Sequence, residues 1–383
     1  MRVLHVHSGN LYGGVETLMV TLARESYRCP RMQGEFALCF EGRLAGELRE
    51  AGAVVHSLGA ARMRNPLSVM AARRRLKELI GERAVDAAVT HMPWAQALFG
   101  STVRRAGIPL VFWMHHAASG RHWTEWRASR TVPDRVLCNS QYTASTLRRL
   151  YTDIAVQTIT YPVAIDPIQL GHAERLSIRD ELSTPGDATV IIQASRMEPW
   201  KGHELHLQAL GLLRDQPDWI CWIAGGAQRP AERCYQAELE RMASEAGIAD
   251  RVRFLGHRSD MPRLLSAADI FCQPNKGPEP FGIVFIEALA AGLPIVSVAF
   301  GGVKEIVNED CGVLIPPGDH QSLASVLRDL INRPDERRRL GQAGPARAAE
   351  LCDPATQLHR IERAIASAAR AMPGERMAGS EAV

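Results

Sequence analysis

The stretch TVIIQASRMEPWKGHELHLQALGLL, residues 189–213, decides the fold class. It opens with six residues that are almost all apolar or β-branched, which is typical of a buried strand. A short loop with Arg196 and Lys201 follows, and apolar residues then recur at helical spacing from about residue 202. A strand that leads directly into a helix is the repeating unit of a parallel sheet, so the stretch predicts an α/β protein.

The same strand-to-helix rhythm runs through the whole chain. Strand patterns lie at 2–7, 35–40, 53–58, 86–90, 109–114, 134–138 and 157–160, and again at 189–194, 219–224, 251–254, 269–273, 294–298 and 312–314. Helical patterns lie at 16–27, 44–51, 66–81, 95–106, 142–150, 202–213, 231–246, 260–267, 281–291, 319–331 and 334–350. This alternation predicts two Rossmann-like, doubly wound parallel-sheet domains in tandem.

An irregular segment rich in Pro and Gly, 161–187, separates the two halves. We therefore predict an N-terminal domain over 1–165 and a C-terminal domain over 166–353. Residues 354–371 form a further helical pattern that opens on a proline, as helices often do. The small and polar residues 372–383 are expected to be a flexible tail.

Composition points to an ordinary globular protein of two or three domains. The chain has 383 residues, 46% hydrophobic and 23% charged, and a net charge of only +3, which does not favour a nucleic-acid binder. Eight cysteines without C-x-x-C spacing are typical of free thiols in a reducing compartment. No signal-peptide pattern and no apolar run of about 18 residues is visible, so we expect a cytoplasmic protein.

Ligands of such sheets bind where the strands end at their carboxyl edge, so the turns after the strands are the candidate sites. After the first strand, Gly13 and Gly14 precede a helix, where backbone amides favour anions. No G-x-G-x-x-G spacing is present, which argues against a nicotinamide enzyme. After the strand near 109–114, His115 and His116 follow directly, and we expect at least one imidazole at the ligand edge.

Arg196 and Lys201 lie beside a strand end and a helix start, an arrangement that suits a diphosphate. Leu255, at the end of a later strand, lies in a segment whose backbone suits a flat ligand such as a base. In EPFGIVFIEALAAG, Glu279 is expected in the loop before a helix that starts near Phe281, and Glu287 about two turns inside it. A poorly solvated carboxylate needs partners, and a pair of ligand hydroxyls would serve.

Metal-binding motifs are missing. The sequence contains no D-x-D, no H-E-x-x-H and no Cys/His cluster. We therefore expect no metal and no cofactor, and expect Arg196, Lys201 and helix amides to meet the charge of a leaving diphosphate.

The order of these motifs resembles GT-B-fold glycosyltransferases of family 4. The resemblance rests on S-R-x4-K-G, F-L-G, A-D-x-F-x-x-P, E-P-F-G-x4-E-A-x-A-x-G-x-P and G-G-x-x-E-I-V in the second half, and more loosely on YGGVE and PLVFWMH in the first. It implies two domains facing across a cleft, with a nucleotide-sugar donor bound mainly by the C-terminal domain. It further implies metal-independent hexosyl transfer with retention of configuration, with the 354–371 helix completing the N-terminal, acceptor-side domain.

The resemblance also assigns residue roles. Arg196 and Lys201 would hold the diphosphate, Glu279 the donor hexose and Glu287 the ribose hydroxyls. Backbone at Phe281, Gly282 and Ile283 would contact sugar or phosphate, Leu255 would flank the donor, and Gly13–Gly14 would approach the diphosphate. Catalysis would involve His115, Glu279, Arg196 and Lys201.

Two departures from the family pattern leave questions open. His116 stands where the family often has Gly or Asp, so either His115 or His116 faces the donor. The family's usual serine before the first glutamate is absent from QPNKGPE.

Several alternatives also stay open. UDP and GDP sugars are not separated by these motifs. A nucleotide-sugar epimerase or hydrolase and a non-catalytic nucleotide-sugar-binding subunit are the other functions considered. Basic residues of the first half (Arg73–Arg75, Lys77, Arg104, Arg105, Arg148 and Arg149) and tryptophans (Trp94, Trp113, Trp123 and Trp126) favour a lipid-linked or phosphorylated glycan acceptor and peripheral contact with an anionic membrane.

Overall fold

The computed structural model describes residues 1–10, 12–164, 170–227 and 229–370. The predicted boundary at 165 and the predicted tail 372–383 lie outside these residues. Contacts divide the chain into two compact units, one formed by Met1–Ala164 and the C-terminal residues from Cys352 onward, the other by Ile165–Leu351. Each unit contains one parallel sheet with helices on both faces, so the predicted α/β fold class is confirmed.

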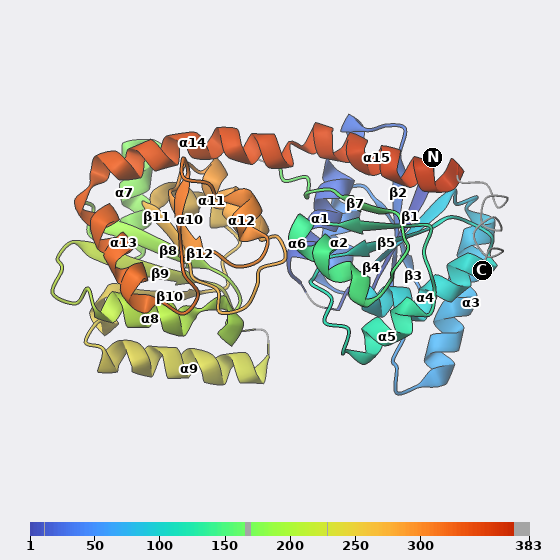
Figure 1. Cartoon of the computed structure of the whole chain (residues 1–383), viewed down its shortest axis with the longest axis horizontal. Coiled ribbons are helices and arrows are strands. Elements are labelled where there is room, and N and C mark those ends of the chain that lie inside the picture. Colours follow the sequence, from blue (N-terminus) through green and yellow to red (C-terminus); the bar gives the residue numbers. More distant parts are fainter. Residues whose placement is uncertain (11, 165–169, 228, 371–383) are drawn as a thin grey trace, which may run out of the picture. The chain divides into compact units, whose positions relative to one another are not determined.

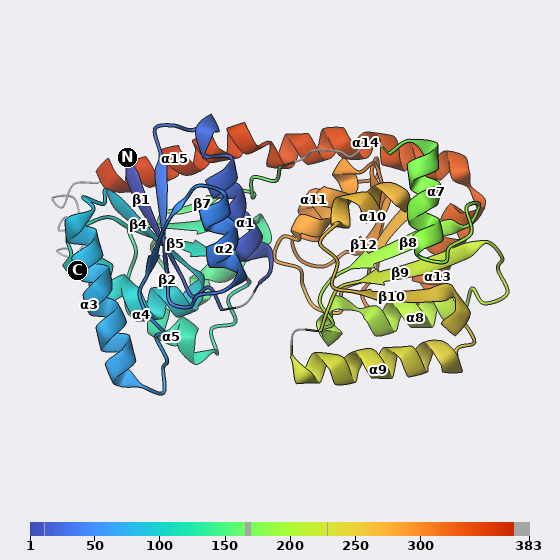
Figure 2. The same cartoon turned by 180° about the vertical axis from the view of Figure 1, so that it is seen from behind.

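Unit 1 is built on a seven-stranded sheet with the strand order β3-β2-β1-β4-β5-β6-β7. Its strands are β1 Arg2–His7, β2 Gln33–Leu38, β3 Val54–Ser57, β4 Ala87–His91, β5 Leu110–Met114, β6 Arg135–Cys138 and β7 Val156–Thr158. Its helices are α1 Gly14–Arg24, α2 Arg43–Glu50, α3 Pro66–Glu82, α4 Met92–Arg105, α5 Trp123–Ser129, α6 Gln141–Thr146 and α15 Pro354–Arg370, with 3-10 turns at Ser26–Arg28 and Leu147–Arg149. The layers around this sheet can be followed in Figures 1 and 2.

The two faces of the unit 1 sheet differ in character. Side chains such as Leu4 and Val6 point into an apolar core with α3 and α4. On the opposite face, His5 and His7 alternate with these residues and lie toward α1, as the two-residue period of a strand requires. Parallel sheets usually bury apolar side chains on both faces, so the histidines on the α1 side of this sheet are unusual.

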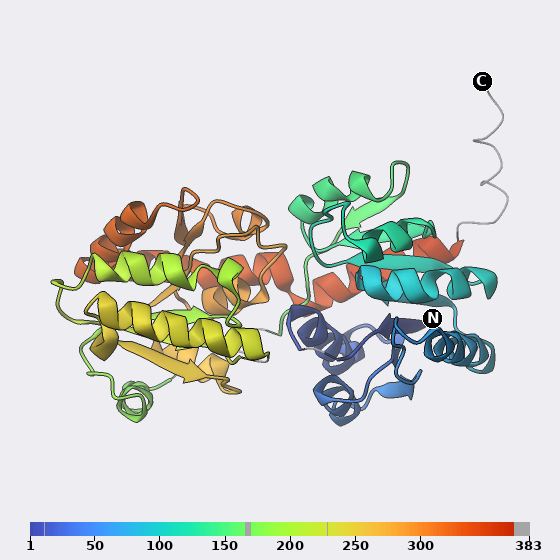
Figure 3. The same ribbon diagram turned by 90° about the horizontal axis from the view of Figure 1, so that it is seen from below.

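Unit 2 is built on a six-stranded sheet with the order β10-β9-β8-β11-β12-β13. Its strands are β8 Thr189–Ala194, β9 Trp219–Ala224, β10 Val252–Gly256, β11 Ile270–Gln273, β12 Ile295–Val298 and β13 Gly312–Ile315. Its helices are α7 His172–Glu181, α8 His203–Gly211, α9 Pro230–Glu245, α10 Met261–Ala267, α11 Ile283–Ala290, α12 Val303–Ile306, α13 His320–Asn332 and α14 Pro334–Cys352, with 3-10 turns at Pro199–Lys201 and Ala249–Arg251. The adjacent helices α8 and α9 run side by side in Figure 3.

The strand predictions are confirmed to within two residues at most ends, because continuous apolar runs mark doubly buried strands. The prediction that 161–187 is irregular is wrong, because α7 occupies His172–Glu181. That helix buries only Ile178 and Arg179, so it lacks the apolar stripe by which a helix is recognised. The short helix α5 was also not predicted; His122 and Glu125 form a capping box at its start.

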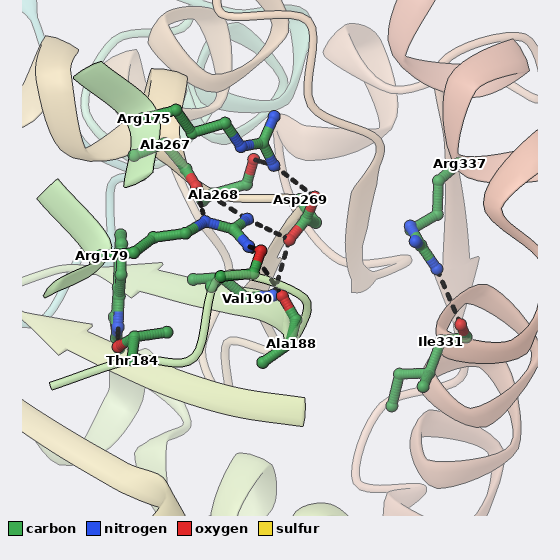
Figure 4. A network of polar contacts seen from close by, with 12 residues as sticks. Arg175, Arg179, Thr184, Ala188, Val190, Ala267, Ala268, Asp269, Ile331 and Arg337 are labelled. Atoms are coloured by element: carbon green, nitrogen blue, oxygen red, sulfur yellow. Dashed lines mark hydrogen bonds and ion pairs between the residues drawn. The ribbon is translucent and has the colours of Figure 1, made fainter. Parts of the chain in front are cut away.

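Helix α7 is held to the sheet by one buried arginine (Figure 4). The guanidinium of Arg179 donates to the carbonyls of Ala267, Gly186 and Ala188 at 2.9–3.1 Å, and to Asp269 Oδ2 at 2.7 Å. Asp269 in turn accepts from the backbone amide of Val190 at 2.7 Å and from Arg175. The pair thereby joins α7 to the first residues of β8 and β11.

Replacing Asp269 with Asn should destabilise unit 2, because Arg179 would keep a buried charge without its counter-ion. We expect a loss of about 3 kcal/mol in the free energy of unfolding. Urea unfolding followed by the fluorescence of buried Trp219 and Trp222 measures it. The exposed Asp215→Asn is the matched control, and equal effects of the two substitutions would contradict the structural role of Asp269.

Candidate functional site

Polar side chains on both sides of the loop after β8 hold this loop in place by hydrogen bonds. The amide of Gln193 donates to the carbonyl of Lys201 at 3.0 Å, and its oxygen lies 2.8 Å from Nδ1 of His206. Ser195 Oγ lies 3.2 Å from Nε2 of His203. Sequence reasoning missed Gln193, His203 and His206, although a Gln within an apolar strand and two His within an apolar helix were visible signals. These contacts fix where Arg196 and Lys201 emerge.

The same loop touches the loop after β11 through backbone atoms. Gly202 has φ +76°, and a Cβ there would lie 1.8 Å from the carbonyl oxygen of Pro274. The amides of Lys276 and Gly277 donate to the carbonyl of Trp200 at 2.8 and 3.2 Å. Only glycine permits this approach, because any side chain at position 202 would collide with the neighbouring backbone.

Lys201 and Glu279 meet where these two loops touch. Lys201 Nζ donates to Glu279 Oε2 at 2.7 Å, and the side chains of the two residues are only 14% and 8% exposed. Asn275 donates to the same oxygen at 2.8 Å, and Lys201 also lies 3.9 Å above the ring of Trp200. The structure therefore brings two of the predicted site residues into direct contact, as an ion pair.

Arg196 has a separate carboxylate partner. It lies 3.0 Å from Glu198, which also accepts a hydrogen bond from the indole of Trp200 at 2.9 Å. The side chain of Arg196 is 32% exposed, so it remains accessible from solvent. Both predicted cations are thus held beside carboxylates, and an incoming anion would compete with those carboxylates for them.

A third loop, after β12, closes on Glu279 from its backbone side. The amide of Gly302 donates to the carbonyl of Glu279 at 2.7 Å, and Gly301 forms a bridge with the same residue. Gly301 and Gly302 therefore form a turn in which two backbone segments approach closely. Three strand-to-helix loops thus meet at one residue, Glu279, at the carboxyl edge of the sheet.

The two glutamates of the 279–287 segment are separated as predicted. Helix α11 begins at Ile283, two residues later than expected, after Gly282 with φ +91°. Glu279 lies in the preceding loop, whereas Glu287 lies about 6 Å along the helix from its first residue. Phe281, two residues before the helix, is buried. The first amides of α11, at Ile283 and its neighbour, have no acceptor within their own helix, which suits an anion or a polar ligand.

Glu287 differs from Glu279 in having no counter-charge. Within the described ranges, no hydrogen bond or ion pair involves its carboxylate, and burial raises its pKa to about 7. Glu287 is half-buried, and an unpaired carboxylate that is partly shielded from water gains free energy from any hydroxyl donors that reach it.

Leu255 lies near the end of β10 and is partly buried. The carbonyl of the next residue, Gly256, accepts from the amide of Gly225 at 2.8 Å, so the ends of β9 and β10 are tied together. Leu255 thus lies at the same carboxyl edge of the unit 2 sheet as Lys201 and Glu279.

In unit 1, the turn after β1 leads into α1 as expected. Gly14 is the first residue of α1, and Gly13 precedes it with an extended backbone (φ −170°) that any residue adopts. A Cβ at position 13 would lie 3.7 Å from Glu16 Oε2, an ordinary contact distance, so the structure does not require glycine there. Glu16 of α1 pairs with His7 of β1 at 2.7 Å, and both side chains are buried.

His115 and His116 have different surroundings. His115 is buried, with Nε2 at 2.9 Å from His91 and Nδ1 at 2.6 Å from the Tyr161 hydroxyl. His116 is partly exposed and pairs with Glu125 at 3.3 Å, while its Nδ1 has no partner within the described part of the chain. Burial lowers the pKa of both rings, most strongly for His115. Both nitrogens of His115 are therefore engaged, whereas His116 keeps one available.

Comparison with known proteins supports the assignment that the fold and these loops suggest. Residues 174–347 match the family model "Glycosyl transferases group 1", and residues 12–163 match "Glycosyltransferase Family 4". The GDP-mannose-dependent alpha-(1-6)-phosphatidylinositol monomannoside mannosyltransferase of Mycolicibacterium smegmatis is 28% identical over 70% of this chain and 73% of its own length. The D-inositol 3-phosphate glycosyltransferase of Saccharomonospora viridis is 30% identical over 64% of this chain and 62% of its own length, which is less than two thirds.

A solved structure, Anabaena Alr3699/HepE in complex with UDP, aligns with a TM-score of 0.86. It is 24% identical and covers 96% of this chain and 100% of that one. The protein is thus a GT-B-fold glycosyltransferase. The chain belongs to glycosyltransferase family 4, whose members use nucleotide sugars.

The structure adds two negative observations, both restricted to the described residues. No group of three or more His, Cys, Asp or Glu side chains is arranged to hold a metal ion. No helix combines the length and apolar composition that a membrane-spanning segment requires.

Glu287→Gln should stabilise the protein more at pH 8 than at pH 4.5. The folded pKa of about 7 exceeds the ordinary value of 4.5, so the folded state binds more protons than the unfolded state between these values. The contribution of Glu287 to the stability of the wild type therefore falls as pH rises from 4.5 to 7, and above pH 7 the cost of burying its charge is complete. The glutamine lacks this cost, which amounts to roughly 1–3 kcal/mol.

The measurement is the free energy of urea unfolding at several pH values for both proteins. Exposed Glu309→Gln is the control and should show a difference that does not depend on pH. A Glu287→Gln difference that stays constant from pH 4.5 to 8 would show that Glu287 is ordinarily solvated.

Proposed function

We propose that this protein transfers a hexose from a UDP- or GDP-sugar to a hydroxyl of a glycan or lipid-linked acceptor, with retention of configuration and without a metal ion. The observation that carries the proposal is the buried Lys201–Glu279 pair, with unpaired Glu287 nearby on α11. Opposite charges and a free carboxylate at one sheet edge match a ligand that has both anionic and hydroxyl groups.

In this proposal unit 2 binds the donor. Arg196, Lys201 and the first amides of α11 meet the diphosphate, and Glu287 accepts hydrogen bonds from the ribose hydroxyls. Glu279 accepts hydrogen bonds from the hexose, with the backbone at Phe281, Gly282 and Ile283 beside it. Support comes from the placement of these groups on loops that hydrogen-bond to one another.

Lys201 and Glu279 then change partners when the donor binds. A diphosphate carries more negative charge than one carboxylate, so it attracts the Lys201 ammonium and releases Glu279 for the sugar hydroxyls. Asn275 continues to hold the carboxylate in place. The ligand-free ion pair thus keeps both groups satisfied and oriented until the donor arrives.

Unit 1, completed by α15, is proposed as the acceptor side. His115 or His116 and the turn at Gly13–Gly14 would meet the donor sugar and diphosphate from this unit. The relatives' names include a phosphatidylinositol mannoside and an inositol phosphate, so a polyol or glycolipid acceptor with a phosphate is the class that we propose.

Front-face transfer is the proposed mechanism. Glu279 is held by Lys201 and Asn275, which suits a binding group rather than a free nucleophile. The leaving phosphate oxygen would take the proton of the acceptor hydroxyl, while Arg196 and Lys201 stabilise the charge that develops on the diphosphate. A covalent glycosyl ester on Glu279 of the wild-type protein, detected by mass spectrometry after incubation with the donor, would contradict this mechanism.

A panel of nucleotides and nucleotide sugars separates this proposal from its rivals. Thermal shift and calorimetry with UDP, GDP and their hexose derivatives should reveal one preferred nucleotide. Release of that nucleotide without any acceptor, at the full turnover rate, would favour a hydrolase or epimerase. Binding of none of them would favour a non-catalytic subunit and overturn the proposed donor site.

Lys201→Met should weaken binding of the preferred nucleoside diphosphate by roughly 10- to 100-fold, because one charge-assisted contact with phosphate is worth about 1.5–3 kcal/mol. The affinity for the corresponding nucleoside should change much less, since the base and ribose do not contact Lys201. Calorimetry with both ligands tests this. Exposed Lys77→Met of unit 1 is the control, and an unchanged diphosphate affinity in Lys201→Met would contradict the assignment.

For contact with a membrane, the proposed surface is formed by exposed apolar residues of α3 and α5. Leu67 and Met70 are 75% and 64% exposed, and Trp123 and Trp126 are 46% and 54% exposed. Burial lowers the pKa of Arg73 in α3, and the positive charge of Arg127 in α5 lowers it further. The two side chains therefore lie close enough to affect each other. Apolar and aromatic side chains among arginines are typical of surfaces that bind anionic membranes.

The arginines and tryptophans of this region do not contribute equally. Arg73 donates to the carbonyl of Leu98 at 2.7 Å and Arg75 to that of Leu58 at 3.3 Å, so both have structural contacts. The side chain of Arg74 is 82% exposed and lies 2.8 Å from Glu78. Trp113 is fully buried, so core packing explains it, whereas Trp123 and Trp126 are available to a partner.

Changing Trp123 and Trp126 together to Ser should lower binding to vesicles of phosphatidylglycerol and phosphatidylcholine by about 10-fold or more, because two indole rings would no longer enter the interface. Co-sedimentation measures this binding. Leu212→Ser, which removes an equally exposed apolar side chain from unit 2, should have no effect. Equal binding of all three proteins would refute the surface.

A further inference from the structure

The histidine-rich face of the unit 1 sheet contains a continuous chain of hydrogen bonds. His5 Nδ1 lies 3.0 Å from His91 Nε2, and His91 Nδ1 lies 2.9 Å from His115 Nε2. His115 Nδ1 lies 2.6 Å from the hydroxyl of Tyr161. All four side chains are at most 4% exposed, so the histidine chain, as we call these four residues, is excluded from solvent.

Sheet register and ring stacking keep these residues in line. His91 is paired with Trp113 across β4 and β5, which brings His115, two residues further on, to the same face. The rings of His91 and His115 lie edge to edge and nearly coplanar, with centroids 5.1 Å apart and planes 5° apart. The ring of Trp113 lies 5.6 Å from that of His91 and 5.3 Å from that of His115, centroid to centroid. None of the three imidazoles can rotate without breaking several contacts.

Burial also keeps the imidazoles neutral. It lowers the pKa of His5 to about 4 and holds the pKa values of His91 and His115 well below their ordinary value. A neutral imidazole carries one N–H and one bare nitrogen. In each nitrogen-to-nitrogen bond, one ring must donate and the other must accept.

This condition allows only two proton arrangements. If His5 donates from Nδ1, then His91 and His115 must also carry their protons on Nδ1. If His115 donates from Nε2, then His91 and His5 must carry theirs on Nε2. The three rings therefore always share one tautomer, and the tautomer of His115 is tied to a ring that it does not touch.

Each end of the histidine chain lies beside a group or a cavity that can favour one of the two proton arrangements. Tyr161 accepts from the amide of Asn139 at 3.1 Å, so its hydroxyl is already oriented. At the other end, His5 lines a cavity of about 370 Å³ together with Gly34 and Phe36, which is large enough for water.

We propose that His91 and His5 are positioning residues for the transfer reaction. They hold the His115 ring in one orientation and one tautomer, so that a donor hydroxyl that replaces Tyr161 meets a nitrogen of fixed hydrogen-bonding character. This inference rests on the proposed function, and of the two histidines left open there it takes His115 as the ring that meets the donor sugar. It adds two residues, on β1 and β4, that touch neither donor nor acceptor.

The tautomers can be read directly in the wild-type protein labelled with 15N-histidine. Long-range 1H–15N spectra should show His5, His91 and His115 in the same tautomer at pH 7. The single substitution Tyr161→Phe should then shift the 15N signals of His5. The same substitution should not shift them when it is combined with His91→Phe. Mixed tautomers, or no response of His5 to Tyr161→Phe, would overturn the coupling without any reference to activity.

Kinetics tests the positioning role. His91→Phe keeps an aromatic ring beside Trp113 but removes the hydrogen bonds to His5 and His115. We expect it to lower kcat/KM by up to roughly 100-fold. His91→Asn keeps an amide where Nδ1 was and should restore much of that loss, because it still reaches His115. Affinity for the nucleoside diphosphate alone should be unchanged in both variants.

Exposed His359→Phe is the matched control for loss of a histidine from unit 1. Wild-type kcat/KM in His91→Phe, or equal losses in His91→Phe and His91→Asn, would overturn the positioning role. If the wild type turns over no nucleotide sugar, the proposed function fails. The tautomer measurement still decides whether the tautomers of His5, His91 and His115 are coupled.

Discussion

The ion pair between Lys201 and Glu279 is the contact on which the geometry of the candidate donor site depends. It joins the loop after β8 to the loop before α11, and the carbonyl of Glu279 holds the loop after β12. Such a pair forms only if the backbones approach closely, which Gly202 permits beside Pro274. Two poorly exposed charges are costly to separate from their partners, so each loop is held where the other requires it.

The polar side chains at the carboxyl edges of the two sheets differ in charge. Unit 2 carries full charges, Arg196 and Lys201 opposite Glu198 and Glu279, which suits recognition of an ionic ligand. Unit 1 carries neutral imidazoles whose charge is suppressed by burial, which suits hydrogen bonding without a net charge. A nucleotide sugar presents both kinds of group, an anionic diphosphate and neutral hydroxyls.

Much of the fold and part of the site followed from local patterns. Continuous apolar runs marked the strands, and the helix start predicted near Phe281 placed Glu279 outside the helix and Glu287 inside it, as the start of α11 at Ile283 bears out. Helix α7 was missed because its contact with the sheet is made by Arg179 rather than by an apolar stripe. Gln193, His203 and His206 were missed because their role is to support the Lys201 loop, which only spatial contacts reveal.

The sequence by itself determined the α/β class, the order of the strands along the chain, and the residue types at each turn, because these depend on periodicity and spacing within a few residues. Only the tertiary structure decided which groups meet. Lys201 and Glu279 are 78 residues apart, and His5, His91 and His115 come from three different segments of the chain. Their pairing depends on strand order and register, which are set by the packing of the whole sheet and not by any local pattern.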